Sequence, residues 1–194
     1  TMIKVFDQMR IMRGFVDKNF SGRDWNLATA MVMNGEAAFQ IMGDWAKGEF
    51  SAKGLKPGKD YYCSPTPSNK GYLYNVDSFV FYNVKGADKL EGQKLLASLI
   101  MGKNFQKVFN MYKGSIPARL DVSMADFDDC AKKSNADLNA ASKAGGLMPS
   151  YAHGMALKGA QSGAITDVVT EHFNSNMSSK DAAKKLAAAV KASL

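Results

Sequence analysis

The 194-residue chain is 46% hydrophobic and 22% charged, which is enough to bury a substantial core in one domain or in two small lobes. No apolar run approaches the roughly 18 residues that a membrane-spanning helix needs. The net charge of +7 is carried by scattered lysines, among them Lys47, Lys107 and Lys133, without the arginine-rich block of nucleic-acid readers, so we expect a solvated charged surface and no nucleic-acid partner.

Apolar residues spaced three and four apart predict two helices at the start of the chain. The first helix carries its apolar face on Val5, Phe6, Met9, Met12, Phe15 and Val16. It is expected to end near residues 17–20. The second runs from Trp25 to Met33, and Asn34-Gly35 ends it because glycine readily takes the left-handed conformation that closes a helix.

The apolar run 37–42 is short enough to be a buried strand, and Gly43 then turns the chain. Asp44 and Trp45 are thereby expected at the carboxyl end of a strand, where open α/β sheets collect their ligands. A tryptophan there offers a flat apolar face and one hydrogen-bond donor. From these residues alone, Trp45 is equally well explained as a half-buried packing residue.

Residues 51–70 are rich in glycine, proline and serine and predict a loop. A strand with aromatic residues on both faces is predicted over 71–82, with Asp77 in its middle. Two helices follow, over 88–101 and 105–112. Lys113-Gly114 ends the second of them. The first is expected to be buried through five residues: Leu90, Leu95, Leu96, Leu99 and Ile100.

Three further helices are predicted towards the end of the chain. They span residues 126–143, 163–174 and 182–194. Between the first two, Tyr151–Gly154 forms a short loop that contains His153. Ser178 and Asp181 form a capping box that opens the last helix. His172 lies inside a helical pattern and is expected at the surface.

Catalytic and metal-binding patterns are lacking in the sequence. A glycoside hydrolase needs two carboxylates at a controlled separation, and no pair of Asp or Glu residues shows such a signature. Neither His153 nor His172 belongs to a G-x-S-x-G or H-E-x-x-H motif, and no phosphate-binding glycine motif occurs. Cys63 and Cys130 lie 67 residues apart, which matches no C-x-x-C metal site. We therefore expect no enzyme, no metal ion and no cofactor.

Three stretches, taken in order, resemble a known family. They are Asn34–Trp45, which reads NGEAAFQIMGDW, then Tyr74–Phe79, and Gly114–Arg119 followed by Asp121-Val122. Together they look like the sugar-binding members of the extracellular solute-binding proteins that feed bacterial ABC importers. The resemblance covers essentially the whole chain and favours the glucose- and mannose-binding type. No single motif is specific, whereas the ordered set is.

The resemblance implies an α/β, two-lobe fold of the periplasmic-binding-protein type (type II, like maltose-binding protein), incomplete in this chain. The matches belong to the carboxyl half of proteins about twice as long. Residues 1–55 and 117–194 would then form parts of the carboxyl lobe, and 56–116 part of the amino lobe with the hinge crossings. The chain begins without a signal peptide, so either a leader was removed or the start is missing, and the resemblance favours the second.

An incomplete two-lobe fold leaves sheet edges exposed, because the strands that normally pair with them are absent. We expect these edges to be covered by the missing amino-terminal half or by a second copy of the chain. The other partners that the resemblance implies are a monosaccharide and the permease subunits of an ABC transporter. The implied localisation is the periplasm.

The resemblance also assigns roles in a sugar site. A pyranose ring needs an aromatic platform for its apolar face and charged or amide groups for its hydroxyls. Trp45 would be the platform, Asp77 the acceptor from hydroxyl pairs, Lys113 a charged donor, and His153 would close the rim. Three further residues match less specifically and would orient the others: Asn75, Asp44 and Arg119.

Other roles remain open for three of these residues. Asp77 also fits a cap on a strand bulge, Lys113 a charge that neutralises a helix end, and His153 an ordinary loop histidine. In an oxidising periplasm Cys63 and Cys130 would form a disulfide, whereas in a reduced protein both would be small buried hydrophobic residues. The implied function is capture of a neutral hexose, glucose above all, for an importer. A glycoside hydrolase and a non-catalytic interaction domain are the alternatives.

Overall fold

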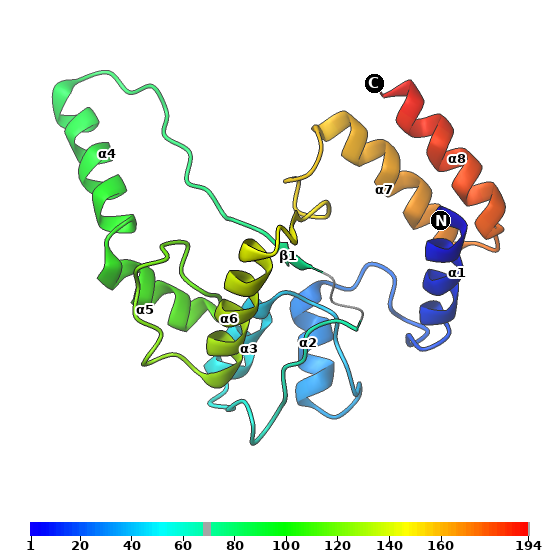
Figure 1. The fold of residues 1–194 in the computed structure, drawn as a ribbon, viewed down its shortest axis with the longest axis horizontal. Helices are drawn as coiled ribbons and strands as arrows, with labels where there is room; N and C mark the ends of the chain where they lie inside the picture. The colour runs from blue at the N-terminus through cyan, green and yellow to red at the C-terminus, as the bar shows by residue number, and fades with distance from the viewer. Residues whose placement is uncertain (68–70, 194) are drawn as a thin grey trace. The chain divides into compact units, whose positions relative to one another are not determined.

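A computed structural model describes residues 1–67 and 71–193 (Figure 1). The end of the predicted loop at residues 68–70 and the last residue of the predicted final helix lie outside the described residues. The chain divides into two compact units, which we call unit 1 (residues 1–23 and 149–194) and unit 2 (residues 24–148). The assignment of segments to an amino and a carboxyl lobe stays a prediction. Within the described residues no helix is both long and apolar enough to cross a membrane.

Unit 1 is a packed group of three helices (Figure 1). They are α1 (Met2–Arg13), α7 (Gly159–Asn174) and α8 (Ser179–Ala192). Phe6 of α1, Val168 of α7, and Ala182 and Leu186 of α8 form its buried core. The three predicted helices are therefore confirmed, with α1 ending earlier than expected. Phe15, which was placed on its buried face, follows the helix and is 85% exposed.

Hydrogen bonds fix both ends of the α7–α8 turn. Arg10 of α1 donates from its guanidinium to the main-chain oxygens of His172, Ser175 and Met177, at 2.7, 2.6 and 2.9 Å. The bond to His172 satisfies a carbonyl that the end of α7 leaves without a helical partner, and the other two bind carbonyls of the turn itself. Ser178 accepts a hydrogen bond from the amide of Asp181 at 3.1 Å, which confirms the predicted cap of α8.

The prediction for His172 is wrong, because its ring is completely buried rather than at the surface. It packs against Phe6, with ring centroids 4.7 Å apart, on the face of α7 that meets α1. Neither ring nitrogen has a hydrogen-bond partner within the described residues. Burial lowers the pKa of His172 below its ordinary value, the charges of Arg10 and Arg13 lower it further, and Asp7 opposes them.

We expect unit 1 to lose stability in mild acid. Because the pKa of His172 is lower in the folded than in the unfolded chain, the unfolded chain binds this proton more readily. The contribution is fully present above the ordinary pKa of 6.5 and is lost as pH falls from there towards the folded value. Hydrogen exchange of α7 and α8 between pH 7 and pH 5 measures it. His153→Gln changes the only other histidine and should leave this pH dependence in place. If the pH dependence disappears in that variant, His153 and not His172 causes it.

Unit 2 is mostly helical. Its elements are α2 (Trp25–Met33), the 3₁₀ helix η1 (Asp44–Ala46), α3 (Lys47–Ala52), β1 (Tyr72–Tyr74), α4 (Ala87–Ile100), α5 (Lys103–Lys113), α6 (Asp129–Lys143) and, where it joins unit 1, β2 (Leu147–Pro149). The four longer helices match the predicted ones within a few residues. Gly35 has a φ of +74°, so its predicted left-handed conformation is confirmed. Gly114, which was predicted only to end a helix, follows α5 with a φ of +87°.

The predicted strands are largely wrong. Residues 37–42 form no strand, and Phe39 and Ile41 are 90% and 67% exposed instead of buried. Of the predicted strand over 71–82, only β1 forms, and it pairs with β2 in a two-stranded sheet. The physical reason is that a strand persists only where a neighbour completes its hydrogen bonds, and the described residues offer no further strand beside these segments. The open α/β sheet is thus absent from the described residues.

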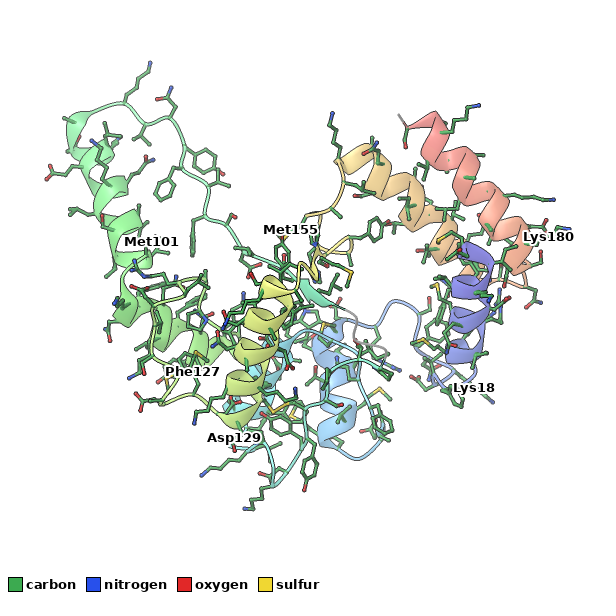
Figure 2. The ribbon with its side chains drawn as sticks, in the orientation of Figure 1. Lys18, Met101, Phe127, Asp129, Met155 and Lys180 are labelled. Atoms are coloured by element: carbon green, nitrogen blue, oxygen red, sulfur yellow. A yellow bond between two sulfur atoms is a disulfide. The ribbon has the colours of Figure 1, made fainter. Side chains whose placement is uncertain are left out.

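Helix α4 is correctly predicted but less buried than expected (Figures 1 and 2). Only Ile100 is buried, whereas Leu90, Leu95, Leu96 and Leu99 are between 46% and 65% exposed. The preceding segment 79–82 carries a similar run of exposed side chains, with Phe79 at 56% and Val80 at 75%. A helix buries its apolar face only where another element packs on it. The pattern therefore predicted the helix correctly, but no element of the described residues buries these four leucines.

Candidate functional site

The Asp44–Trp45 pair begins a helix instead of ending a strand. Both residues lie in η1, which continues directly into α3, and the amide of Ala46 donates to the Gly43 carbonyl at 3.1 Å. The predicted strand-end position is therefore wrong. The ring of Trp45 lies against Gly43 so closely that a β-carbon there would be 2.2 to 2.5 Å from three atoms of its six-membered ring.

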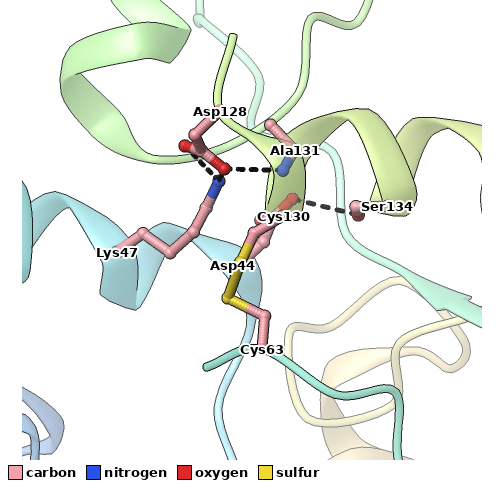
Figure 3. Close-up of a disulfide and its surroundings, with 7 residues drawn as sticks. All are labelled: Asp44, Lys47, Cys63, Asp128, Cys130, Ala131 and Ser134. Carbon is pink, nitrogen blue, oxygen red and sulfur yellow. Dashed lines mark hydrogen bonds and ion pairs between the residues drawn. A yellow bond between two sulfur atoms is a disulfide. The ribbon is translucent and has the colours of Figure 1, made fainter. Parts of the chain in front are cut away.

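A chain of polar groups leads inward from Asp44. The Ser134 hydroxyl donates to Asp44 Oδ2 at 3.4 Å (Figure 3). Tyr72 Oη lies 2.6 Å from the same hydroxyl. Burial raises the pKa of Asp44 above its ordinary value, and the positive charges of Lys47 and Lys113 oppose that effect. Burial also raises the pKa of Tyr72. Asp44 is thus a partly buried carboxyl with two lysines near it.

Three other predicted residues meet beside this carboxyl. Lys113 forms an ion pair with Asp77 through Nζ and Oδ2, and the Asn75 amide donates to Asp77 Oδ1 at 3.1 Å. Lys113 is also one of the charges that act on Asp44. The Asp77 side chain is 60% exposed and that of Lys113 31%, so both heads reach solvent. The structure therefore brings Asn75, Asp77 and Lys113 together and places the charge of Lys113 near Asp44.

A close contact between two main chains sets the position of Lys113. A β-carbon added at Gly48 of α3 would lie 2.7 Å from the Lys113 carbonyl oxygen. One added at Gly114 would lie 2.6 Å from the Gly48 nitrogen. Such distances leave no room for a side chain on either residue. The end of α5 therefore rests directly on α3, the helix that follows Asp44 and Trp45.

A buried ion pair and a disulfide support the base of the site (Figure 3). Lys47 Nζ lies 2.9 Å from both carboxylate oxygens of Asp128, which also caps α6 by accepting from the Ala131 amide at 2.8 Å. Lys47 is only 5% exposed, so its predicted place on a solvated surface is wrong. Next to this pair, Cys63 and Cys130 form a disulfide with Cα atoms 5.8 Å apart.

Arg119 lies in a surface ion pair. Its guanidinium donates to both carboxylate oxygens of Asp121 at 2.8 Å and to the Met101 carbonyl at 3.1 Å. The pair with Arg119 holds the pKa of Asp121 well below its usual range. These contacts tie the segment after α5 to the end of α4, and a role of Arg119 towards a ligand stays a prediction.

His153 belongs to unit 1, in the loop between β2 and α7. Its Nδ1 lies 2.7 Å from the Ser150 hydroxyl, and Ser150 is buried. The neighbouring Tyr151 donates to the Ser162 carbonyl at 2.7 Å. The loop is therefore a defined structure in which Ser150 contacts the imidazole at Nδ1. Its predicted role at the rim of a sugar site is not tested by these contacts.

Sequence reasoning missed four residues that build the site: Tyr72, Ser134, Lys47 and Asp128. Asp128 is an acidic residue of the kind that caps helices, but the predicted helix over 126–143 placed it inside the helix, whereas it is the cap of α6. Tyr72 and Ser134 are 62 residues apart, and no local sequence pattern predicts their hydrogen bond. In residues 1–67 and 71–193, no group of three His, Cys, Asp or Glu side chains is placed to hold a metal ion.

Comparison with known proteins gives one consistent set of relatives, while no family model matches the chain. A probable sugar-binding periplasmic protein of Brucella suis is 50% identical over 193 residues, which is 99% of this chain and 46% of that protein. A protein of the same description from Rhizobium meliloti is 47% identical over 192 residues, 98% of this chain and 46% of its own length.

A more distant relative has a transport description. It is an uncharacterized ABC transporter extracellular-binding protein of Pyrococcus horikoshii, 35% identical over 171 residues, which is 88% of this chain and 38% of that protein. The chain thus spans about half the length, or less, of the curated relatives it matches. The predicted periplasmic localisation is confirmed by the relatives described as periplasmic.

Proposed function

We propose that this chain is the carboxyl-terminal half of a receptor that binds a neutral hexose, glucose above all, and delivers it to an ABC importer. Support comes from the sugar-binding and ABC transporter descriptions of its relatives. The observation that carries the proposal is the cluster of Asn75, Asp77 and Lys113, whose lysine also acts on Asp44 beside Trp45.

The cluster has the chemistry that a hexose needs. A sugar hydroxyl both donates and accepts, so a carboxylate and an ammonium group side by side can bind adjacent hydroxyls. An exposed ion pair of this kind contributes only about 0 to 1 kcal/mol to folding, so hydroxyls can separate Asp77 from Lys113 at little cost. Trp45 then covers the apolar face of the ring.

The rest of the mechanism is proposed to follow that of two-lobe receptors. Two-lobe receptors bind their ligand between lobes that close by a hinge, and the closed form docks on the transporter. His153, held by Ser150 in unit 1, is proposed to close the rim of the sugar site. The remaining wall is proposed to lie in the amino-terminal half, outside this chain.

One observation favours a second candidate, a glycoside hydrolase. Asp44 has a raised pKa, as a general acid requires, and a second carboxylate, that of Asp77, belongs to the same cluster. Hydrolysis of a glycoside by the same protein would favour this reading over the receptor.

The test is a calorimetric titration of the gene product that contains this chain with glucose, galactose and mannose. Asp77→Asn is expected to weaken binding about 10- to 100-fold, since a hydroxyl loses a charged acceptor worth about 1 to 3 kcal/mol. The matched control is Asp126→Asn, because Asp126 pairs with Lys107 of α5 and is equally exposed, at 60%. It should leave the affinity unchanged.

Three outcomes separate the candidates. Saturable binding without release of product supports the receptor. Cleavage of an aryl glucoside that is lost in Asp44→Asn favours the hydrolase. No binding of any mono- or disaccharide by the gene product overturns the proposed function.

A further inference from the structure

Gly43 stands in direct contact with the Trp45 ring. Three ring atoms, Cζ3, Cη2 and Cε3, lie 2.2, 2.3 and 2.5 Å from the position that a β-carbon of residue 43 would occupy. Real β-carbons essentially never approach other heavy atoms below 3.0 Å. A side chain of any size at this position therefore displaces the ring, because the ring is the movable partner.

The backbone at Gly43 gives no other reason for a glycine. Its φ of −70° and ψ of 167° are ordinary extended values that any L-residue adopts. By contrast, Gly35, Gly54 and Gly58 have φ between +73° and +79°, where a side chain would be strained. The conformation at residue 43 would thus tolerate alanine, and only the space taken by Trp45 forbids it.

We infer that Gly43 is a positioning residue that fixes the orientation of the Trp45 ring in the sugar site. This inference rests on the proposed function. Because the six-membered ring occupies the space that a side chain of residue 43 would fill, the absence of that side chain fixes where the ring lies. Gly43 therefore determines how tightly a hexose is bound without touching it.

The position of the ring matters because stacking depends on geometry. An aromatic face attracts the C–H groups of a sugar only at contact distance and in a nearly parallel arrangement. Asp44, the residue between Gly43 and Trp45, is held by Ser134 and by nearby charges. A tilted ring would therefore lose its alignment with the hydroxyl-binding groups even though those groups stay in place.

The experiment compares Gly43→Ala with a matched control, Gly92→Ala. Gly92 lies in α4, and a β-carbon there has nothing within 4 Å. In the gene product labelled with 5-fluorotryptophan, the ¹⁹F signal of Trp45 is assigned by its absence in Trp45→Phe. Gly43→Ala is expected to shift this signal and to weaken glucose binding about tenfold, a loss typical of one aromatic contact. Gly92→Ala should change neither quantity.

A double substitution tests whether the effect passes through the ring. With Trp45 already replaced by alanine, Gly43→Ala should change the affinity for glucose less than twofold. An equal loss with and without Trp45, or an unchanged ¹⁹F signal in Gly43→Ala, overturns the inference. If the protein binds no hexose at all, the proposed function fails, yet the ¹⁹F signal still decides whether Gly43 sets the position of the ring.

Discussion

Replacing Cys63 and Cys130 by serine is expected to lower the free energy of unfolding of unit 2 by about 4 kcal/mol. The disulfide closes a loop of 67 residues, and the loss of chain entropy in the unfolded state predicts a stabilisation of that size. It joins the segment before β1 to the first turn of α6, beside Lys47 and Asp128 (Figure 3). In the periplasm the bond is chemically maintained, because this compartment is oxidising.

Urea denaturation of the gene product, followed by hydrogen exchange of α6, measures this effect. The native protein should become less stable on addition of dithiothreitol, whereas the serine variant should be insensitive to it. If reduction changes the unfolding free energy by less than about 1 kcal/mol, the disulfide does not constrain the unfolded chain as the entropy model requires.

Asp128→Asn is expected to destabilise unit 2 by about 3 kcal/mol. Lys47 is 5% exposed, and its two contacts with Asp128, each of 2.9 Å, provide its counter-charge. Removing one partner of a buried ion pair leaves the other charge unpaired in a medium that solvates it poorly, at a cost of about 3 to 5 kcal/mol. The Asp128 side chain is 33% exposed, so water reaches the site and the lower end of the range applies. Asparagine still accepts the Ala131 amide and preserves the cap.

The decisive comparison is the double variant Lys47→Met/Asp128→Asn. It removes both charges and is expected to recover most of the lost stability, because a hydrophobic chain of similar length then fills the buried space. Thermal unfolding of the single and double variants gives the interaction energy. If the double variant is as unstable as the sum of two single losses, the two residues act independently and the buried pair is not what stabilises this region.

Helices could be predicted from this sequence because their signals are local. Trp25–Met33 is bounded by a positive-φ glycine, and Ser178 caps α8 through a hydrogen bond that spans three residues. Such patterns act within a single turn of chain. The strand over 37–42 could not be predicted in the same way, since a strand depends on a neighbour that can lie anywhere in the sequence.

In the candidate site, too, contacts between residues far apart in the sequence could not be predicted. The family resemblance predicts a site with Asp44, Asp77 and Lys113, and in the structure Lys113 pairs with Asp77 while its charge also acts on Asp44. The sequence did not reveal the residues that hold these side chains in place. Ser134 reaches Asp44 across 90 residues and Asp128 reaches Lys47 across 81, so both contacts arise only from tertiary folding. A lysine on a charged-looking stretch is indistinguishable from a surface lysine until its surroundings are known.

The contact between Gly48 and the Lys113–Gly114 peptide also bears on motion. Side chains change rotamer in picoseconds to nanoseconds, and a site aligned by side-chain packing fluctuates with them. Here two main chains touch without an intervening side chain, so there is no rotamer whose change could separate them. The main chain that carries the Lys113 ammonium group is therefore packed directly on α3, the helix that follows Asp44 and Trp45. We therefore expect the main chain beneath Lys113 and Asp44 to move less than their charged side-chain ends.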